Sequence, residues 1–568
     1  MGTLTGRKLF PYVAVIAALA CSICAFAKDK EKENNSEIKF TARTELVLIP
    51  TLVTDKSGTH ISGLKKEDFT VLENGSERKL ATFEEITTDT HRLWHPKNPN
   101  EYSNFMGGGE STRRITLIVL DLLNTPFMDQ ANARMQLLKY LTQSLDQREP
   151  TGLFTLTRSG VHVVHDFTTD PRVLLAALHK VKGHTAQTVD SPEEVESITG
   201  SASPDGSAGV DPAAVQTEAQ QLQTMMEDAE LNFQSFQQRL AITYTLDGMQ
   251  QLAQALAGFP GRKSLIWAGG GFPFSVSDNS MQLAPAGRDS LADVMPMYDH
   301  TWQLLNDAQI ALYPLDVKGL QTITPSVSLR NPGRNYARNM SWRQMDTQAT
   351  LQTFASMTGG RAYYNSNDLV KGFRDAVQDS SQYYMLGYYL DQSNTKPGWR
   401  KLAVKVQRDH VQVRARSGFF VRNATVDLET TRDGDISSAL QSPLDYSALP
   451  LVVRWGAIES SKAPGRKRVY YTVNLAPDPA LIDVADNNHV ALEFVALVKT
   501  PEGKQVDHPS DKKVSLHPTP EHLATIRESG IGYRGALDLS PGEYTVRFVV
   551  RDDLSGRVGS VAAPLKVQ

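Results

Sequence analysis

Cysteine is almost absent from this chain of 568 residues, which has two, Cys21 and Cys24. Both precede residue 28, so the rest of the chain has no disulfide and no thiolate for metal binding or nucleophilic chemistry. Long hydrophobic runs are also missing, since the clearest one, residues 12–20, is shorter than the roughly 20 residues that a membrane span needs. The net charge is −4, and no stretch is dense in Lys and Arg. These features argue against stable membrane insertion of the mature chain and against nucleic acid as a partner.

The first 27 residues have the pattern of a secretory signal peptide. Arg7 and Lys8 precede the apolar run, and the small-residue sequence AFA at 25–27 is typical of a cleavage site. We therefore expect an exported protein that is periplasmic, cell-surface or extracellular. A lipidated Cys21 is the alternative, although Leu19 lies one position away from the usual place in a lipidation motif.

The remaining sequence predicts an α/β fold flanked by all-β domains. From Arg113 onward, strands alternate with amphipathic helices, as in a doubly wound, mostly parallel sheet. We expect a linker (28–38), an N-terminal β segment (39–105), an α/β domain (106–395) with a flexible insertion (184–212), a β hairpin that packs with the N-terminal segment (396–422), and a C-terminal β-sandwich (423–568). The hairpin is expected to pair 401–407 with 410–416.

Residues 113–125, RRITLIVLDLLNT, are the most informative stretch for function. Residues 115–120 are almost continuously apolar, which is typical of a strand covered on both faces in a parallel sheet. The strand ends at Asp121 and a polar turn. Because such sheets bind ligands at the carboxyl ends of their strands, we expect the site there.

Several short motifs make the chain similar to von Willebrand factor A domains, and in particular to the bacterial, acidobacterial-type VWFA-related family. Besides Asp121, the resemblance rests on LKKEDF at 64–69, GRKS at 261–264, TGGRAY at 358–363, YMLGY at 384–388 and RARSGFF at 414–420. It extends over roughly residues 40–422. The resemblance implies an exported protein that binds protein ligands and is not an enzyme.

The resemblance also implies a metal-ion-dependent adhesion site, in which oxygen ligands hold Mg²⁺ or another divalent cation. Asp121 matches the family's first aspartate, Thr125 replaces its second serine, and Thr168 is the best match to its threonine, with Thr169 as the alternative. Leu123 takes the place of the first serine, and no carboxylate follows the strand at 264–268. The site is therefore degenerate and favours weak or absent metal binding.

Three further residues are candidates for ligand binding at this edge: Asn124, Gly269 and Gly270. The backbone N–H groups of the glycine run are arranged either as an anion-binding nest or as a tight turn. Asp121 has a second reading as well, in which it accepts hydrogen bonds from the backbone of its own turn.

Enzymatic motifs are missing from the sequence. No phosphate-binding Gly-Lys-Ser or Gly-Lys-Thr follows the glycines, and no Gly-x-Ser-x-Gly nucleophile motif occurs. The expected function is protein binding or adhesion in the cell envelope or outside the cell. A structural envelope component without ligand binding and an unrecognised hydrolase are the alternatives.

Overall fold

The computed structural model describes residues 44–87, 100–104, 115–143, 150–181, 212–276, 283–284, 293–319, 347–391, 396, 398–421, 428–484 and 486–568. The expected signal peptide (1–27), the linker (28–38) and the 184–212 insertion except for its last residue lie outside the described residues. Within the ranges, no helix is long and apolar enough to cross a membrane. The fold is mixed α/β.

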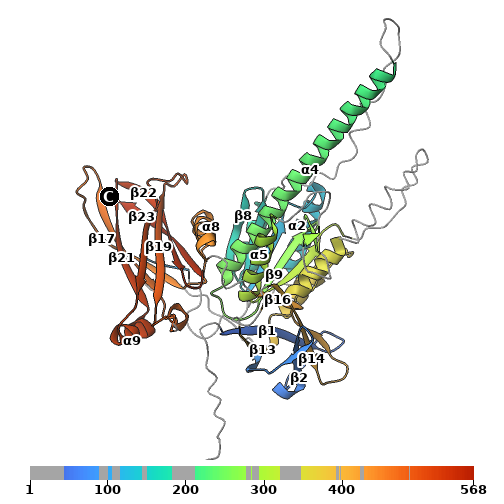
Figure 1. Cartoon of the computed structure of the whole chain (residues 1–568), viewed down its shortest axis with the longest axis horizontal. Helices are drawn as coiled ribbons and strands as arrows, with labels where there is room; N and C mark the ends of the chain where they lie inside the picture. Colours follow the sequence, from blue (N-terminus) through green and yellow to red (C-terminus); the bar gives the residue numbers. More distant parts are fainter. Residues whose placement is uncertain are drawn as a thin grey trace, which may run out of the picture. The chain divides into compact units, whose positions relative to one another are not determined.

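The central element is a mostly parallel five-stranded sheet with the order β12-β9-β6-β7-β8 (Figure 1). Its strands are β6 (Ile115–Asp121), β7 (Thr151–Thr157), β8 (Gly160–Thr168), β9 (Lys263–Gly269) and β12 (Ile310–Asp316). The pairs β6–β7, β6–β9 and β9–β12 are parallel, whereas β7–β8 is antiparallel. Every residue of β6, β7, β9 and β12 is buried, which explains the near-continuous apolar sequences of β6 and β12.

Helices cover both faces of this sheet, so its strands contribute alternate side chains to two cores. One core, with Ile118 and Leu120 of β6, contains residues of α2 (Phe127–Gln143), α3 (Pro171–Leu178) and α7 (Val370–Gln378). The other core, with Leu117 and Val119 of β6, contains residues of α4 (Pro212–Leu256), α5 (Met295–Asp307) and the helix at 347–358. The predicted alternation of strands and helices therefore builds a layered sheet. The short strands β10 (Ser275–Val276) and β11 (Leu283–Ala284) pair with each other.

Two four-stranded sheets combine segments from before and after the central sheet. One has the order β15-β1-β13-β4 and the other β16-β14-β2-β3. A single core joins the two sheets, with Ile49 of β1, Val71 of β2 and Leu386 of β13 among its members. The bounds are β1 (Thr44–Thr54), the 3-10 helix η1 (Lys66–Asp68), β2 (Phe69–Glu73), β3 (Ser76–Arg78), β4 (Thr82–Thr87), β13 (Gln382–Asp391), β14 (Gly398–Val406), β15 (Gln412–Arg414) and β16 (Gly418–Val421).

Three sequence-based expectations about these β segments are wrong. The hairpin between 401–407 and 410–416 does not form, because β14 pairs with β16 and β2 while β15 pairs with β1 in the other sheet. Strand β13, expected within the α/β domain, pairs with β1 and β4 instead. Strand β5 (Glu101–Ser103), expected in the N-terminal segment, pairs with β17 of the C-terminal region. In each case at least one partner is distant in sequence: β2 for β14, β1 for β15 and β13, and β17 for β5.

The C-terminal region has two further four-stranded sheets around one core. Their orders are β21-β18-β17-β5 and β20-β19-β22-β23. The elements are α8 (Leu428–Gln441), β17 (Leu451–Ser460), β18 (Lys467–Leu475), the 3-10 helix η4 (Pro479–Leu481), β19 (Val490–Lys499), β20 (Ser510–Leu516), α9 (Pro520–Ser529), β21 (Ile531–Leu539), β22 (Gly542–Asp552) and β23 (Val558–Val567). The sequence did not predict α8, α9, β20 or β23.

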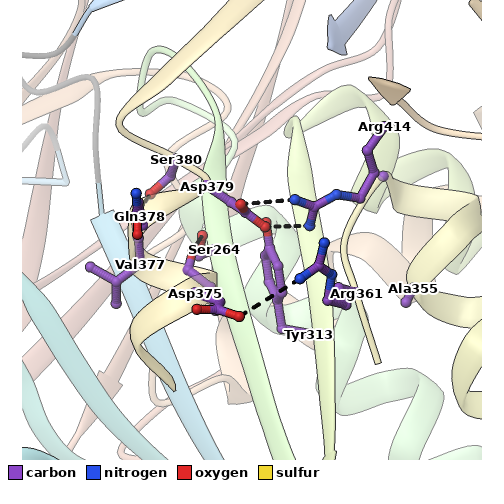
Figure 2. Close-up of polar contacts among 12 residues, drawn as sticks. Ser264, Tyr313, Ala355, Arg361, Asp375, Val377, Gln378, Asp379, Ser380 and Arg414 are labelled. Atoms are coloured by element: carbon purple, nitrogen blue, oxygen red, sulfur yellow. Dashed lines mark hydrogen bonds and ion pairs between the residues drawn. The ribbon is translucent and has the colours of Figure 1, made fainter. Parts of the chain in front are cut away.

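A buried polar network connects β15 to the central sheet. The guanidinium of Arg414 donates to both carboxylate oxygens of Asp379, directly after α7, and the hydroxyl of Tyr313 on β12 donates to the same carboxylate at 3.0 Å. Figure 2 shows this pair beside the weaker contact, at 3.7 Å, between Arg361 and Asp375. Because the side chains of Arg414 and Asp379 are only 20% and 11% exposed, the contact is largely removed from water.

Candidate functional site

Asp121 lies at the carboxyl end of β6, and its carboxylate is saturated with hydrogen bonds. Oδ1 accepts from the backbone N–H groups of Leu123 (3.1 Å) and Asn124 (2.9 Å). Oδ2 accepts from the side-chain amide of Asn124 and from the indole N–H of Trp267, both at 2.9 Å. The residue is 1% exposed. Four donors thus surround a carboxylate that is almost completely buried.

This arrangement makes Asp121 the acceptor that holds the β6–α2 turn together. Burial raises the pKa of the Asp121 carboxyl, and the hydrogen bonds from Asn124, Trp267 and Leu123 partly oppose that rise. A cation needs oxygen atoms with free lone pairs, whereas N–H groups occupy both carboxylate oxygens here. Metal binding at Asp121 would require Trp267 and the Asn124 amide to withdraw.

Asn124 and Thr125 are committed to contacts with neighbouring elements. Besides bonding Asp121, the Asn124 amide donates to the hydroxyl of Thr245 on α4 at 2.9 Å. The Asn124 side-chain oxygen is buried without a hydrogen-bond partner. The Thr125 hydroxyl accepts from the backbone N–H of Gly270 at 2.8 Å. These bonds tie the turn after β6 to α4 and to the loop after β9.

The glycines after β9 are required by close packing. A Cβ atom on Gly269 would lie 2.9 Å from the Cβ of Asp121, and one on Gly270 would lie 3.1 Å from Pro126 and 3.2 Å from Lys318. The N–H of Gly270 is already bonded to Thr125, so it is not free to bind an anion. The geometry fits the tight-turn interpretation of this run.

Thr168 does not join this site. It is the last residue of β8, and it pairs with Thr151 at the start of β7, whereas Asp121 pairs with Leu156 near the end of β7. The two positions are separated by five residues along β7, or about 16 Å. Its hydroxyl accepts from the backbone N–H of Asp170 at 3.1 Å. The expected metal role of Thr168 is therefore wrong, because the antiparallel direction of β8 carries it, with Thr169 next to it, to the opposite edge of the sheet.

Leu123 does not contribute to a metal site either, because its side chain is 1% exposed and belongs to the core shared with α4 and α5. It replaces an oxygen ligand with an apolar group that points into packed protein. Of the predicted residues, the structure brings together Asp121, Asn124, Thr125, Gly269 and Gly270.

Sequence reasoning missed three residues of this edge. Trp267 and Thr245 provide hydrogen bonds, yet in sequence they look like ordinary members of an apolar strand and a helix. Asp316 ends β12 and pairs in register with Gly269, and its Oδ1 accepts from the N–H of Lys318 at 3.0 Å. The position of Asp316 at the end of an apolar strand was the signal that would have found it.

Asp316 does not complete a metal site with Asp121. The two residues lie on β12 and β6, with β9 between them, so their backbones are about 10 Å apart. Burial raises the pKa of the Asp316 carboxyl, and the neighbouring charge of Asp129 adds to that rise while Lys318 opposes it.

The motifs behind the family resemblance have structural roles. Arg262 donates to the carbonyl of Gly359 at 2.6 Å and to the Tyr313 hydroxyl at 3.1 Å. Lys263 donates to the Ala308 carbonyl at 2.5 Å, and burial lowers its pKa to about 7. These residues join the start of β9 to neighbouring elements.

The chain matches no protein-family model and no curated protein sequence.

Proposed function

We propose that this chain is an exported protein-binding protein, and that its central part is a von Willebrand factor A-like domain. Its adhesion edge, the carboxyl ends of β6 and β9 where such domains bind a metal ion, is closed, because hydrogen bonds within the protein occupy the Asp121 carboxylate. Two observations support the domain proposal: the five-stranded sheet with one antiparallel strand, and the helices on both of its faces. The saturated carboxylate of Asp121 supports a closed edge. Export is proposed from the pattern of residues 1–27.

An exposed apolar row on α4 carries the protein-binding proposal. Leu222, Met226, Phe233 and Phe236 are 61%, 61%, 53% and 57% exposed. Together with the exposed Ala229 they are spaced alternately four and three residues apart. This is the heptad spacing by which one helix packs against another. Large apolar side chains that gather on an exposed surface mark interaction sites, and Met and Phe are enriched at the centres of interfaces.

The two halves of α4 have different environments. Near its C-terminal end, Ile242, Leu246 and Met249 are fully buried in the core of the central domain. The N-terminal half extends beyond that core as a single continuous helix (Figure 1). A helix that is anchored at one end and apolar along an exposed row at the other presents a rigid binding surface. The fitting partner offers an amphipathic helix or an apolar groove.

The test is chemical cross-linking and capture from an envelope extract with the full mature chain as bait, carried out in parallel with Mg²⁺ and with EDTA. The variant Leu222→Glu/Met226→Glu/Phe233→Glu should lose the captured protein. The matched control Gln221→Glu/Asn232→Glu changes exposed residues of the same helix outside the row, so it should retain the partner. Circular dichroism checks that the variants keep their helix content. Light scattering shows whether the partner is a second copy of the chain.

Other outcomes distinguish the alternatives. Capture that survives the row variant but disappears in EDTA or in Asp121→Ala would contradict the proposal and favour a metal-dependent adhesion edge. If nothing is captured with either bait, the structural-component alternative is favoured instead.

A further inference from the structure

A second cluster of ligating side chains lies in the C-terminal region, far in sequence from the A-like domain. Asp486, His489 and His517 each offer one ligand atom, and these atoms lie within 4.8 Å of one another. Nothing in the proposed binding function uses these residues. Two imidazoles and one carboxylate form a donor set suited to Zn²⁺, and also to Cu²⁺ and Ni²⁺.

A tight loop fixes two of the three residues. Asp483 and His489 form an antiparallel bridge, in which each backbone N–H donates to the other residue's carbonyl, at 2.9 and 3.1 Å. Between them, Asn487 and Asn488 adopt left-handed conformations, with φ of 49° and 61°. Asparagine tolerates this conformation better than most residues, so the sequence favours the turn. The bridge between Asp483 and His489 therefore keeps Asp486 and His489 close together.

Strand pairing brings the third residue to the same place. Val490 at the start of β19 pairs with Leu516 at the end of β20, so the next position outward sets His489 opposite His517. Directly opposed residues of an antiparallel pair project to the same face with their Cβ atoms about 5 Å apart. The two imidazole rings are stacked, with centroids 4.6 Å apart. Backbone geometry, rather than chance proximity of long side chains, thus creates the His pair.

The contacts around His489 fit a bound cation. Its Nδ1 lies 3.0 Å from Asp486 Oδ2, and its Nε2 lies 2.9 Å from the hydroxyl of Ser515. When Nε2–H donates to Ser515, the Nδ1 lone pair faces a carboxylate oxygen, and the contact is attractive only with a proton or a metal ion between them. A hydrogen bond from the second ring nitrogen is the usual way in which proteins orient a metal-binding histidine.

His517 supplies the adjustable ligand. Its Nε2 lies 4.0 Å from the same Asp486 oxygen, and its side chain is 47% exposed. The rings are nearly parallel, with an interplanar angle of 8°, so both nitrogens point at one ion only after one ring turns. Half-exposed His517 is free to make that rotation, whereas Ser515 and Asp486 hold His489.

We propose that Asp486, His489 and His517 form a site for a borderline divalent transition-metal ion, with Zn²⁺ as the expected occupant and water as a fourth ligand. The ion would join the 483–489 loop to the end of β20. Among the described residues, β20 is a largely exposed edge strand that pairs only with β19, so a metal link there would stabilise a weakly supported strand of its sheet.

The test is calorimetric titration of the untagged mature chain with Zn²⁺. One saturable site per chain is expected. His489→Ala, His517→Ala and Asp486→Asn should each weaken binding by at least about tenfold, since each removes a direct ligand. The matched control His508→Ala removes an exposed histidine of the same region outside the cluster and should bind as the wild type does.

A second readout separates loss of the site from loss of folding. Zn²⁺ should increase the hydrogen-exchange protection of β20 peptides in the wild type and in His508→Ala, but not in the cluster variants. The variants should retain the wild-type far-ultraviolet circular dichroism without Zn²⁺, because all three residues lie on the surface side of the sheet edge. The proposal would be overturned if the wild type shows no saturable Zn²⁺ binding, or if all three cluster variants bind Zn²⁺ as tightly as the wild type does.

Discussion

Replacing Asp121 tests whether the turn after β6 is held by hydrogen bonds within the protein. Asp121→Ala leaves four donors, from Leu123, Asn124 and Trp267, without their acceptor. At about 1–3 kcal/mol for each buried group left unsatisfied, the cost would be about 4–12 kcal/mol if nothing else changed. The variant also stops burying a carboxylate whose burial raises its pKa, which offsets part of the loss. We expect the free energy of opening to fall by about 3–5 kcal/mol, in the lower part of that range, because the neutral donors lose their acceptor while the cost of burying the carboxylate is removed.

Two milder variants make the prediction quantitative. Asp121→Asn keeps one oxygen for the backbone N–H groups but places an amide against the Trp267 indole, so we expect a loss of about 1–3 kcal/mol. Trp267→Phe keeps an aromatic ring in the core but removes the five-membered ring that carries the N–H, so one lone pair of the carboxylate loses its donor and a small cavity remains beside it. The expected order of destabilisation is therefore Asp121→Ala first, followed by the two conservative variants.

Hydrogen exchange measured by mass spectrometry is the suitable assay, because this chain has several cores and a single unfolding transition is not expected. Protection of β6 and β9 peptides is compared in EDTA and in millimolar Mg²⁺. We expect Asp121→Ala to show the full loss of β6 and β9 protection already in EDTA. Adding Mg²⁺ should change the protection of neither the wild type nor the variant. If Asp121→Ala has wild-type protection in EDTA and loses only a Mg²⁺-dependent gain, the reasoning is refuted and Asp121 is a metal ligand.

Three further predictions concern the same domain. Gly269→Ala forces a Cβ to within 2.9 Å of that of Asp121, so overpacking should destabilise β6 and β9 by about 1–3 kcal/mol, and wild-type protection would contradict it. Asp379→Ala leaves Arg414 largely buried without its partner and should cost about 3–5 kcal/mol, whereas Asp379→Leu/Arg414→Met should recover most of this loss, as measured by hydrogen-exchange protection of β12 peptides. Lys263 has a folded-state pKa of about 7 against an ordinary 10.5, so the unfolded chain binds more protons between these values and stability should rise with pH across that window. Lys263→Met should remove that rise, and an unchanged pH profile would contradict this assignment.

The central sheet was largely predictable from sequence because its strands are buried on both faces. Residues 115–120 and 310–316 are short apolar runs that end at an aspartate, and such runs leave few alternatives to a parallel sheet with helices on both sides. The same rule placed Asp121, Asn124 and Gly269 at one edge of the sheet, where the structure has them.

The errors arise where direction or distant pairing decides the structure. The short apolar pattern around Val163 predicted a strand but not its direction, and the reversal of β8 moved Thr168 away from Asp121. Strand β20 was missed because SDKKVSL has no apolar alternation, as expected for an edge strand with one exposed side. The role of Trp267 was invisible, since an indole N–H inside an apolar strand looks like simple core packing until its acceptor is known.

The role that the geometry favours for Asp121, as an acceptor of hydrogen bonds from its own turn, was one of two roles that the sequence predicted. An aspartate that ends a strand before a turn either binds a cation or accepts hydrogen bonds from the turn, and composition alone does not separate these roles. Leu123 and the missing carboxylate after β9 favoured the second role. The four donors around Asp121 supply the physical reason for it.

Calorimetric titration of the mature chain, residues 28–568, with Mg²⁺ and Ca²⁺ tests the closed-edge account most directly. These hard cations prefer oxygen ligands, so the His489 and His517 cluster does not confuse the measurement. The account predicts no saturable heat, in the wild type and in Asp121→Ala alike. Saturable Mg²⁺ binding that disappears in Asp121→Ala would contradict it, because the carboxylate would then be open to a metal and the adhesion edge would be functional.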